Sequence, residues 1–129
     1  MKRCACLFLA LLAAPGAHAA DWKLAGETLR GNRVFVDQST VADVKGIKRA
    51  VVRVEYKEPV PVEGTTVTSM RATALFDCGT KAMATEEVIL YKDEATGAEF
   101  RRTREVETKF APPPEGSFGQ PALGFVCKR

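Results

Sequence analysis

The sequence predicts an α+β fold, in which an antiparallel sheet is followed by a short C-terminal helix packed on one face. Three observations lead to this prediction. Segments that alternate between apolar and polar residues recur along the chain, as strands with one buried face do. Turns rich in glycine and proline separate these segments. A helix-start signal follows the proline run of residues 112–114, near the end of the chain.

Residues 1–19 have the features of a secretory signal peptide. Two basic residues precede an apolar run, residues 7–14, which is much shorter than the ~20 residues of a membrane span. A small-residue cleavage pattern follows and ends at Ala19. We therefore expect export, cleavage after Ala19 and one domain over residues 20–129. The alternative is an uncleaved N-terminal anchor. No later segment reaches membrane-spanning length.

The cysteines indicate the compartment. Cys4 and Cys6 precede the apolar run, whereas a lipid-modified cysteine would follow it, so no lipoprotein is expected. The periplasm is the expected location, with the cell surface or secretion as alternatives. Cys78 and Cys127 remain in the mature chain, and an even pair in an oxidising compartment predicts one disulfide. The bond would close a loop of about fifty residues and contribute roughly 4 kcal/mol in the chain-entropy model.

Charge and histidine content argue against several function classes. The whole chain has 19 Lys and Arg and 16 Asp and Glu, and two of the basic residues leave with the signal peptide, so 17 − 16 leaves +1. A near-neutral domain has no electrostatic basis for binding nucleic acid. His18, the one histidine, also leaves. Its loss removes histidine-dependent catalysis and the commonest zinc ligand, so neither a metal nor a cofactor is expected.

The mature chain is predicted to begin with two strands. Residues 22–25 form a short strand, residues 26–32 are rich in turn formers, and residues 34–36 are the β-favouring core of a second strand. Residues 39–43 contain a weak capping box. They are expected to form a short helical turn that ends at Gly46.

A third strand is predicted over residues 50–57, where Val52 and Val54 share one face of an alternating pattern. Two prolines follow in Pro59-Val60-Pro61. Because proline lacks an N–H group, further pairing is not expected, and residues 58–64 are predicted to be an extended loop.

The longest predicted strand runs from Thr65 to Cys78. It exceeds the usual strand length, so a bulge or bend is expected near Ala72. One face is the more apolar and carries Met70, Ala72, Ala74, Phe76 and Cys78.

The segment of residues 81–94 is ambiguous, because its composition favours a helix while its apolar core, residues 88–91, suits a strand. Residues 94–97 are typical of a hairpin loop, and residues 98–110 alternate as a strand does. A strand after the loop favours a strand before it, so we predict a hairpin.

The C-terminal segment is predicted to form a short helix. Ser117 and Gln120 have the spacing of a capping box, and Gly119 and Gly124 disturb the helix that follows. An irregular segment held by the disulfide is the alternative.

Residues that could carry chemistry are few. Glu86-Glu87 and Asp93-Glu94 are adjacent carboxylates. Neighbours on a strand point to opposite faces, so neither pair is expected to flank one glycosidic bond. Ser69 and Ser117 have no histidine to activate them.

The candidate binding surface consists of basic residues. The sheet arginines are interleaved with glutamates, which is typical of a soluble, ion-paired face, and the alternative is a docking surface for an acidic macromolecule. The candidates are Arg101, Arg102, Arg104, Lys128 and Arg129.

The order of features along the mature chain resembles the surface-adhesin protein E family of small exported bacterial proteins. The residues that carry this resemblance are Trp22, Val34-Phe35-Val36-Asp37 with Ser39, residues 51–56, Phe76-Asp77-Cys78, Ile89-Leu90-Tyr91, Pro114-Glu115-Gly116-Ser117 and Val126-Cys127.

The resemblance implies a six-stranded antiparallel sheet, a disulfide that holds the C-terminal helix, and dimerisation in at least one family member. One family member is an outer-surface adhesin that binds host extracellular-matrix proteins and plasminogen. We therefore expect an exported, non-enzymatic, protein-binding domain, with a homodimer as one expected assembly. The alternatives are a periplasmic inhibitor of a host or rival enzyme, such as a lysozyme, and an unrecognised hydrolase.

Overall fold

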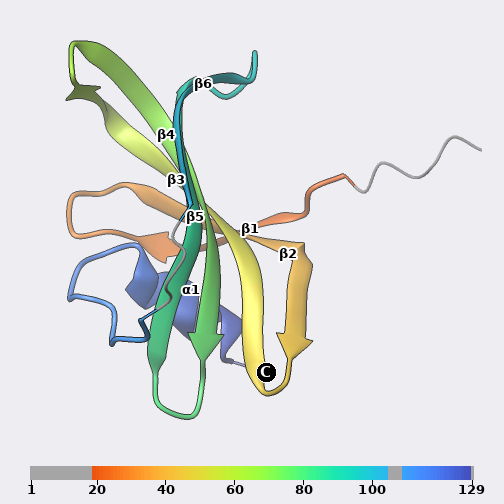
Figure 1. Cartoon of the computed structure of the whole chain (residues 1–129). Helices are drawn as coiled ribbons and strands as arrows, with labels where there is room; N and C mark the ends of the chain where they lie inside the picture. The colour runs from red at the N-terminus through yellow and green to blue at the C-terminus, as the bar shows by residue number, and fades with distance from the viewer. Residues whose placement is uncertain (1–18, 105–108, 129) are drawn as a thin grey trace, which may run out of the picture.

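In the part of the chain that the structure describes, six strands form one antiparallel sheet and one helix packs against it (Figure 1). The computed structural model describes residues 19–104 and 109–128, so most of the predicted signal peptide lies outside the described residues. The strand order is the sequence order, and the predicted α+β fold is confirmed. The elements are β1 (Trp22–Glu27), β2 (Arg33–Val44), β3 (Ile47–Val62), β4 (Thr65–Asp77), β5 (Ala82–Asp93), β6 (Ala98–Arg104) and α1 (Gly119–Val126).

The hydrophobic core lies between the sheet and α1, on what we call the helix face. Alternating residues of the central strands supply it, and Phe76 is its largest fully buried side chain. From α1, Ala122 and Val126 close the core at 0% and 3% exposure. Gly119 begins the helix where a Cβ atom would lie 2.3 Å from Met83 Sδ, so the close approach of α1 to β5 requires glycine.

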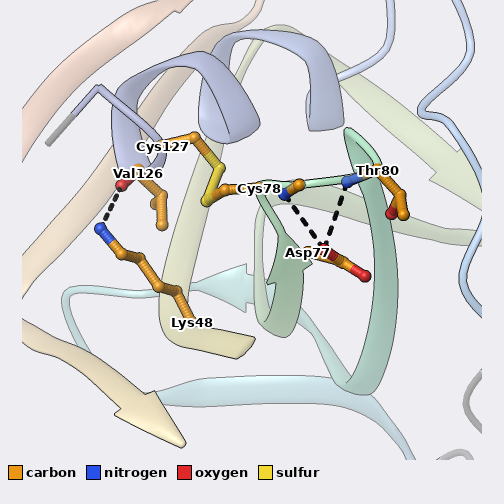
Figure 2. Close-up of a disulfide and its surroundings, with 7 residues drawn as sticks. Lys48, Asp77, Cys78, Thr80, Val126 and Cys127 are labelled. Atoms are coloured by element: carbon orange, nitrogen blue, oxygen red, sulfur yellow. Dashed lines mark hydrogen bonds between the residues drawn. A yellow bond between two sulfur atoms is a disulfide. The ribbon is translucent and has the colours of Figure 1, made fainter. Parts of the chain in front are cut away.

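The predicted disulfide between Cys78 and Cys127 is present and joins the β4–β5 turn to the residue after α1 (Figure 2). The two Cα atoms are 5.4 Å apart, within the usual range for a disulfide. The turn that carries Cys78 is held by Asp77 Oδ1, which accepts hydrogen bonds from the amides of Gly79 and Thr80. Lys48 Nζ donates to the carbonyl of Val126, so the end of α1 is also fastened to β3.

The predicted helical turn at residues 39–43 is wrong, because β2 continues through it as an irregular strand. The side chains that were expected to cap a helix bond within the sheet instead. Ser39 Oγ donates to Asp37 Oδ1, and Thr40 Oγ1 donates to the Asp37 carbonyl while accepting from the Val51 amide. The pairing of β2 with β3 shifts over this stretch, which makes it a bulge.

The predicted loop at residues 58–64 is also wrong, because β3 extends to Val62 and pairs with β4. β2 begins opposite Glu55, so the end of β3 has a neighbour on one side only. Proline is tolerated on such an edge, where its missing N–H group costs no ladder bond. Glu63 and Gly64 then form a two-residue hairpin turn with φ angles of 48° and 78°.

The ambiguous segment of residues 81–94 is strand β5, which confirms the predicted hairpin with β6. The strand predicted over residues 98–110 is shorter than expected, because β6 ends at Arg104 and residues 109–110 belong to no strand; residues 105–108 lie outside the described residues. The long strand β4 is confirmed, and the expected irregularity lies beside Thr73 and Ala74. There Glu86 of β5 is the extra residue. The short C-terminal helix is confirmed, but its capping differs from the prediction. Ser117 Oγ donates to the Pro114 carbonyl and caps no amide of α1.

Candidate functional site

The predicted sheet arginines lie on two different faces. Arg102 pairs with Ile89 on the face opposite α1, which we call the open face, and Arg104 shares this face. Arg101 pairs with Leu90, whose side chain packs against the core, so Arg101 belongs to the helix face. The structure therefore separates Arg101 from the other two.

All three arginines form ion pairs with carboxylates. Arg102 and Arg104 share Glu87, at 3.0 and 2.8 Å, and Arg102 also binds Glu99. Arg101 pairs with Glu63 at the tip of the β3–β4 hairpin. The Arg102 hydrogen bond lowers the pKa of Glu99 below its ordinary value. This arrangement is the ion-paired sheet face that the interleaved glutamates indicated.

Lys128 lies at the other edge of the sheet. It lines an open groove of about 500 Å3 between β1 and the last turn of α1, together with Leu24 and Phe125. β1 and β6 are opposite edges of the sheet, so Lys128 and the β6 arginines do not form one patch. Arg129 lies outside the described residues.

The open face also holds a carboxylate between two arginines, which the sequence analysis did not identify. Glu94 comes from the β5–β6 turn, and its side chain is 11% exposed. Its Oε2 accepts from Arg53 Nε, and its Oε1 accepts from Arg71 Nε at 2.7 Å. Arg53 and Arg71 are cross-strand partners at the centre of the sheet. This triad joins the hairpin turn to the middle of the open face.

Aromatic rings hold the two arginines of this triad in place. The Arg71 guanidinium lies 5.1 Å from the centre of the Trp22 ring and 5.6 Å from that of Tyr91. Arg53 lies 5.7 Å from the Phe35 ring. These are cation–π distances, and they orient both arginines toward Glu94. Burial raises the pKa of Tyr91, against the opposing effect of the Arg71 charge.

Asp37 is the buried acid of the open face, at 6% exposure. Burial alone would raise its pKa. Hydrogen bonds from the Ser39 hydroxyl and from the amides of Asp21 and Ser39, with the charge of Arg71, outweigh burial and leave the pKa below its ordinary value. Asp37 is therefore a structural anion that joins the start of β1 to β2.

Glu86 and Glu87 do not point to opposite faces of the sheet, so the premise from regular strand alternation is wrong. The bulge at Glu86 turns both side chains to the open face, where Glu86 binds Arg49 at 2.9 Å and Glu87 binds the β6 arginines. The alternation of a regular strand could not reveal this, because one extra residue reverses the direction of the next side chain. Both carboxylates are ion-paired.

The serines and the acidic residues lead to no defined reaction centre. Ser69 lies on the open face, and its buried Oγ has no hydrogen-bond partner among the described residues. Ser117 Oγ is used in the loop before α1. Over residues 19–104 and 109–128, no three side chains of the metal-binding types gather in one place. Within those ranges, no helix has the length and apolar character needed to cross a membrane.

A second candidate site lies where the β1–β2 turn meets the loop before α1. A cavity of about 370 Å3 opens between residues 28–32 and residues 115–118, and we call it the turn cavity. Its floor consists of Val54, Tyr56 and Met70 from the sheet. Sequence reasoning treated residues 26–32 as a connection only. The one available signal was an apolar residue, Leu29, among turn formers.

Solved structures similar to this one include those of protein E from Haemophilus influenzae. Its crystal form II gives a TM-score of 0.56 at 11% identity, covering 88% of this chain and 93% of that chain. The selenomethionine form gives 0.55 at 13% identity, with 90% and 92% covered. Protein E of the non-typeable bacterium gives 0.54 at 11% identity, with 88% and 80% covered. Identities this low establish the shared fold only.

No curated protein sequence matches the chain. The sequence profile of the surface-adhesin protein E family, by contrast, matches residues 22–128, which includes every described strand, the helix and both bonded cysteines. The chain belongs to the surface-adhesin protein E family.

Proposed function

We propose that this chain is an exported, non-enzymatic domain that binds a protein partner. The observation that carries the proposal is the family match over residues 22–128, which spans the whole sheet and α1. The family description names surface adhesion, and an adhesin acts by binding rather than by catalysis. The open and shallow surfaces of the molecule suit contact with a large partner better than enclosure of a small substrate.

Export is the second part of the proposal. It rests on the signal-peptide features of residues 1–19. The disulfide is consistent with it, because such bonds persist in oxidising compartments. We propose a single mature domain from residue 20 onward, located in the periplasm, with display at the cell surface as the alternative. Cys4 and Cys6 precede the apolar run, so no lipid anchor is proposed.

Of the binding surface predicted from the sequence, we keep Lys128 in the proposal and leave out the β6 arginines. Each β6 arginine already has a carboxylate partner within the chain, so an acidic partner would have to compete with those ion pairs. Lys128 is exposed, and no ion pair of its side chain is found among the described residues. We therefore place the proposed contact away from β6.

The test begins with the full chain, expressed with a C-terminal tag and recovered from the extracytoplasmic fraction. Binding is measured by surface plasmon resonance on immobilised extracellular-matrix proteins and plasminogen. The thermally unfolded chain is the control. We expect saturable binding by the folded chain and an N-terminus at Ala20. Recovery of the chain in the cytoplasm with residues 1–19 attached would contradict export.

Two further measurements separate the alternatives. Inhibition of lysozyme without any matrix binding would favour the enzyme-inhibitor function. Turnover in a broad hydrolase screen, abolished by replacing a single serine such as Ser69, would contradict the non-enzymatic assignment. Digestion of the tag by protease added to whole cells would indicate surface display, whereas protection would favour the periplasm.

A further inference from the structure

The β1–β2 turn is held rigidly against the loop before α1. The Gly31 amide donates to the Thr28 carbonyl at 2.9 Å, so Leu29 and Arg30 are the central residues of a β-turn. The Leu29 amide donates to the Gly116 carbonyl at 2.9 Å. Gly116 is needed there, because a Cβ atom would lie 2.7 Å from Leu29 Cβ. The two central side chains are therefore presented from a fixed backbone.

Leu29 is the most exposed of the large apolar side chains that the structure describes, at 87%. Leu29 lines the turn cavity but leaves it open. The apolar residues Val54, Tyr56, Met70 and Phe118 line the same cavity. An exposed leucine beside an open apolar cavity leaves two apolar surfaces side by side in water. Such clustering is typical of protein interaction sites rather than of scattered surface residues.

Arg30, the neighbour of Leu29, differs from the other arginines of the described chain. Each of the others has a carboxylate partner, whereas Arg30 is exposed and has none among the described residues. Arg30 also lines the turn cavity. An unpaired arginine can donate hydrogen bonds to a partner's carboxylate without first breaking an ion pair within its own chain.

We infer that the turn cavity, with Leu29 and Arg30 at its rim, is a docking site for a segment of a partner protein in which an apolar residue stands next to an acidic one. The apolar side chain enters the cavity against Tyr56 and Met70, and the carboxylate binds the Arg30 guanidinium. The inference rests on the proposed protein-binding function and names the surface that performs it.

A second charged residue of the cavity lining adds selectivity. Glu115 lines the same cavity, is exposed, and has no ion-pair partner among the described residues. Its charge repels a second acidic residue on that side of the partner segment. A segment with a single carboxylate next to its apolar residue is therefore preferred to a polyacidic one.

The test uses the exported full chain and a display library of short random peptides. We expect selected peptides to contain an apolar residue beside Asp or Glu, and to shift the NMR amide signals of Leu29, Arg30 and Gly116. Leu29→Ser and Arg30→Gln should each weaken binding about tenfold, as expected for residues central to an interface. Arg30→Gln should also remove the preference for acidic over lysine-substituted peptides.

Matched controls are Leu24→Ser, an exposed leucine on β1, and Arg101→Gln, an ion-paired arginine at the opposite edge of the sheet. Both should bind the peptides as the unmodified chain does. Thermal unfolding of each variant shows whether the fold is retained. Equal binding by Arg30→Gln, amide shifts elsewhere on the molecule, or a selection that yields no peptide overturns the inference.

The same variants separate this inference from the proposed function. If Leu29→Ser and Arg30→Gln bind the matrix proteins as tightly as the unmodified chain, the docking site is wrong and the protein-binding function stands. If the unmodified chain binds no protein while the peptides still occupy the turn cavity, the proposed function fails on its own.

Discussion

The two faces of the sheet are stabilised by different physical means. The helix face is apolar and excludes water, with valines, alanines and Phe76 buried beneath α1. The open face carries charged residues that neutralise one another, with the Arg53–Glu94–Arg71 triad at its centre. The helix face is stabilised by removing apolar area from water, and the open face by pairing partly buried charges. Responses to mutation, salt and pH should therefore differ between the faces.

The largest effect is expected on the helix face. Phe76→Ala removes the largest fully buried side chain and leaves a cavity, so the free energy of unfolding should fall by about 3–5 kcal/mol. Urea denaturation at neutral pH measures the change. Phe110→Ala is the matched control, because Phe110 is 41% exposed, and its effect should be about 1 kcal/mol or less. Similar losses in the two variants would contradict the assignment of the core.

A smaller effect is expected from the open-face triad. Glu94→Gln removes the carboxylate that Arg53 and Arg71 share and leaves Arg53 with the longer 3.5 Å pair to Glu55, so it should cost about 2 kcal/mol, between the values for exposed and buried pairs. The matched control is Glu63→Gln. That residue pairs with Arg101 with 69% of its side chain exposed, so its change should be about 0.5 kcal/mol or less.

High salt should enlarge the difference between the stability losses of Glu94→Gln and Glu63→Gln. Partly buried charges are screened less than exposed ones, so the Glu94→Gln deficit should persist at about 1 M salt. The small Glu63→Gln deficit should vanish there. Disappearance of both deficits in salt would mean that the open face is a solvated surface, without the partly buried triad described above.

The smallest expected change in the free energy of unfolding is its pH dependence through Asp37. The pKa of Asp37 is lowered from 3.8 in the folded state, so its ionised form favours folding. This stability is present above the unfolded-state pKa and is lost as the pH falls through the lower folded-state value. The stability advantage of the unmodified chain over Asp37→Asn should therefore shrink below about pH 4. Urea denaturation from neutral to acidic pH measures it. An advantage that does not change with pH would contradict the lowered pKa.

The sequence was sufficient for features that depend on local periodicity. Alternation placed Val52 and Val54 on the buried face, and the two mature cysteines indicated their own bond. Prediction from the sequence failed where the secondary structure of a segment depends on which strands lie beside it in the fold. Pro59 is compatible with β3 only because no strand lies on that side, and Thr40 bonds to the Val51 amide instead of capping a helix.

The candidate sites were less predictable than the fold. Glu94 was assigned to a hairpin loop, and nothing local indicates that it reaches back to Arg53 and Arg71, far earlier in the sequence. The turn cavity depends on residues 28–32 meeting residues 115–118, two segments separated by most of the sheet. Long-range contacts of this kind have no periodic signal in the sequence. The β6 arginines could be identified from the sequence because they lie close together along one strand.

The sequential strand order has a consequence for how the chain folds. Each strand pairs with the one before it, so every hairpin can close over a short loop at a small entropic cost. Only α1 must return across the sheet, from beyond β6 to a position beside β1 and β2. Bringing α1 to β1 and β2 closes the longest loops of the fold and therefore carries the largest loop-closure entropy. The bond between Cys78 and Cys127 then ties the end of the returned helix covalently to the β4–β5 turn, so the longest-range contact of the fold does not depend on packing alone.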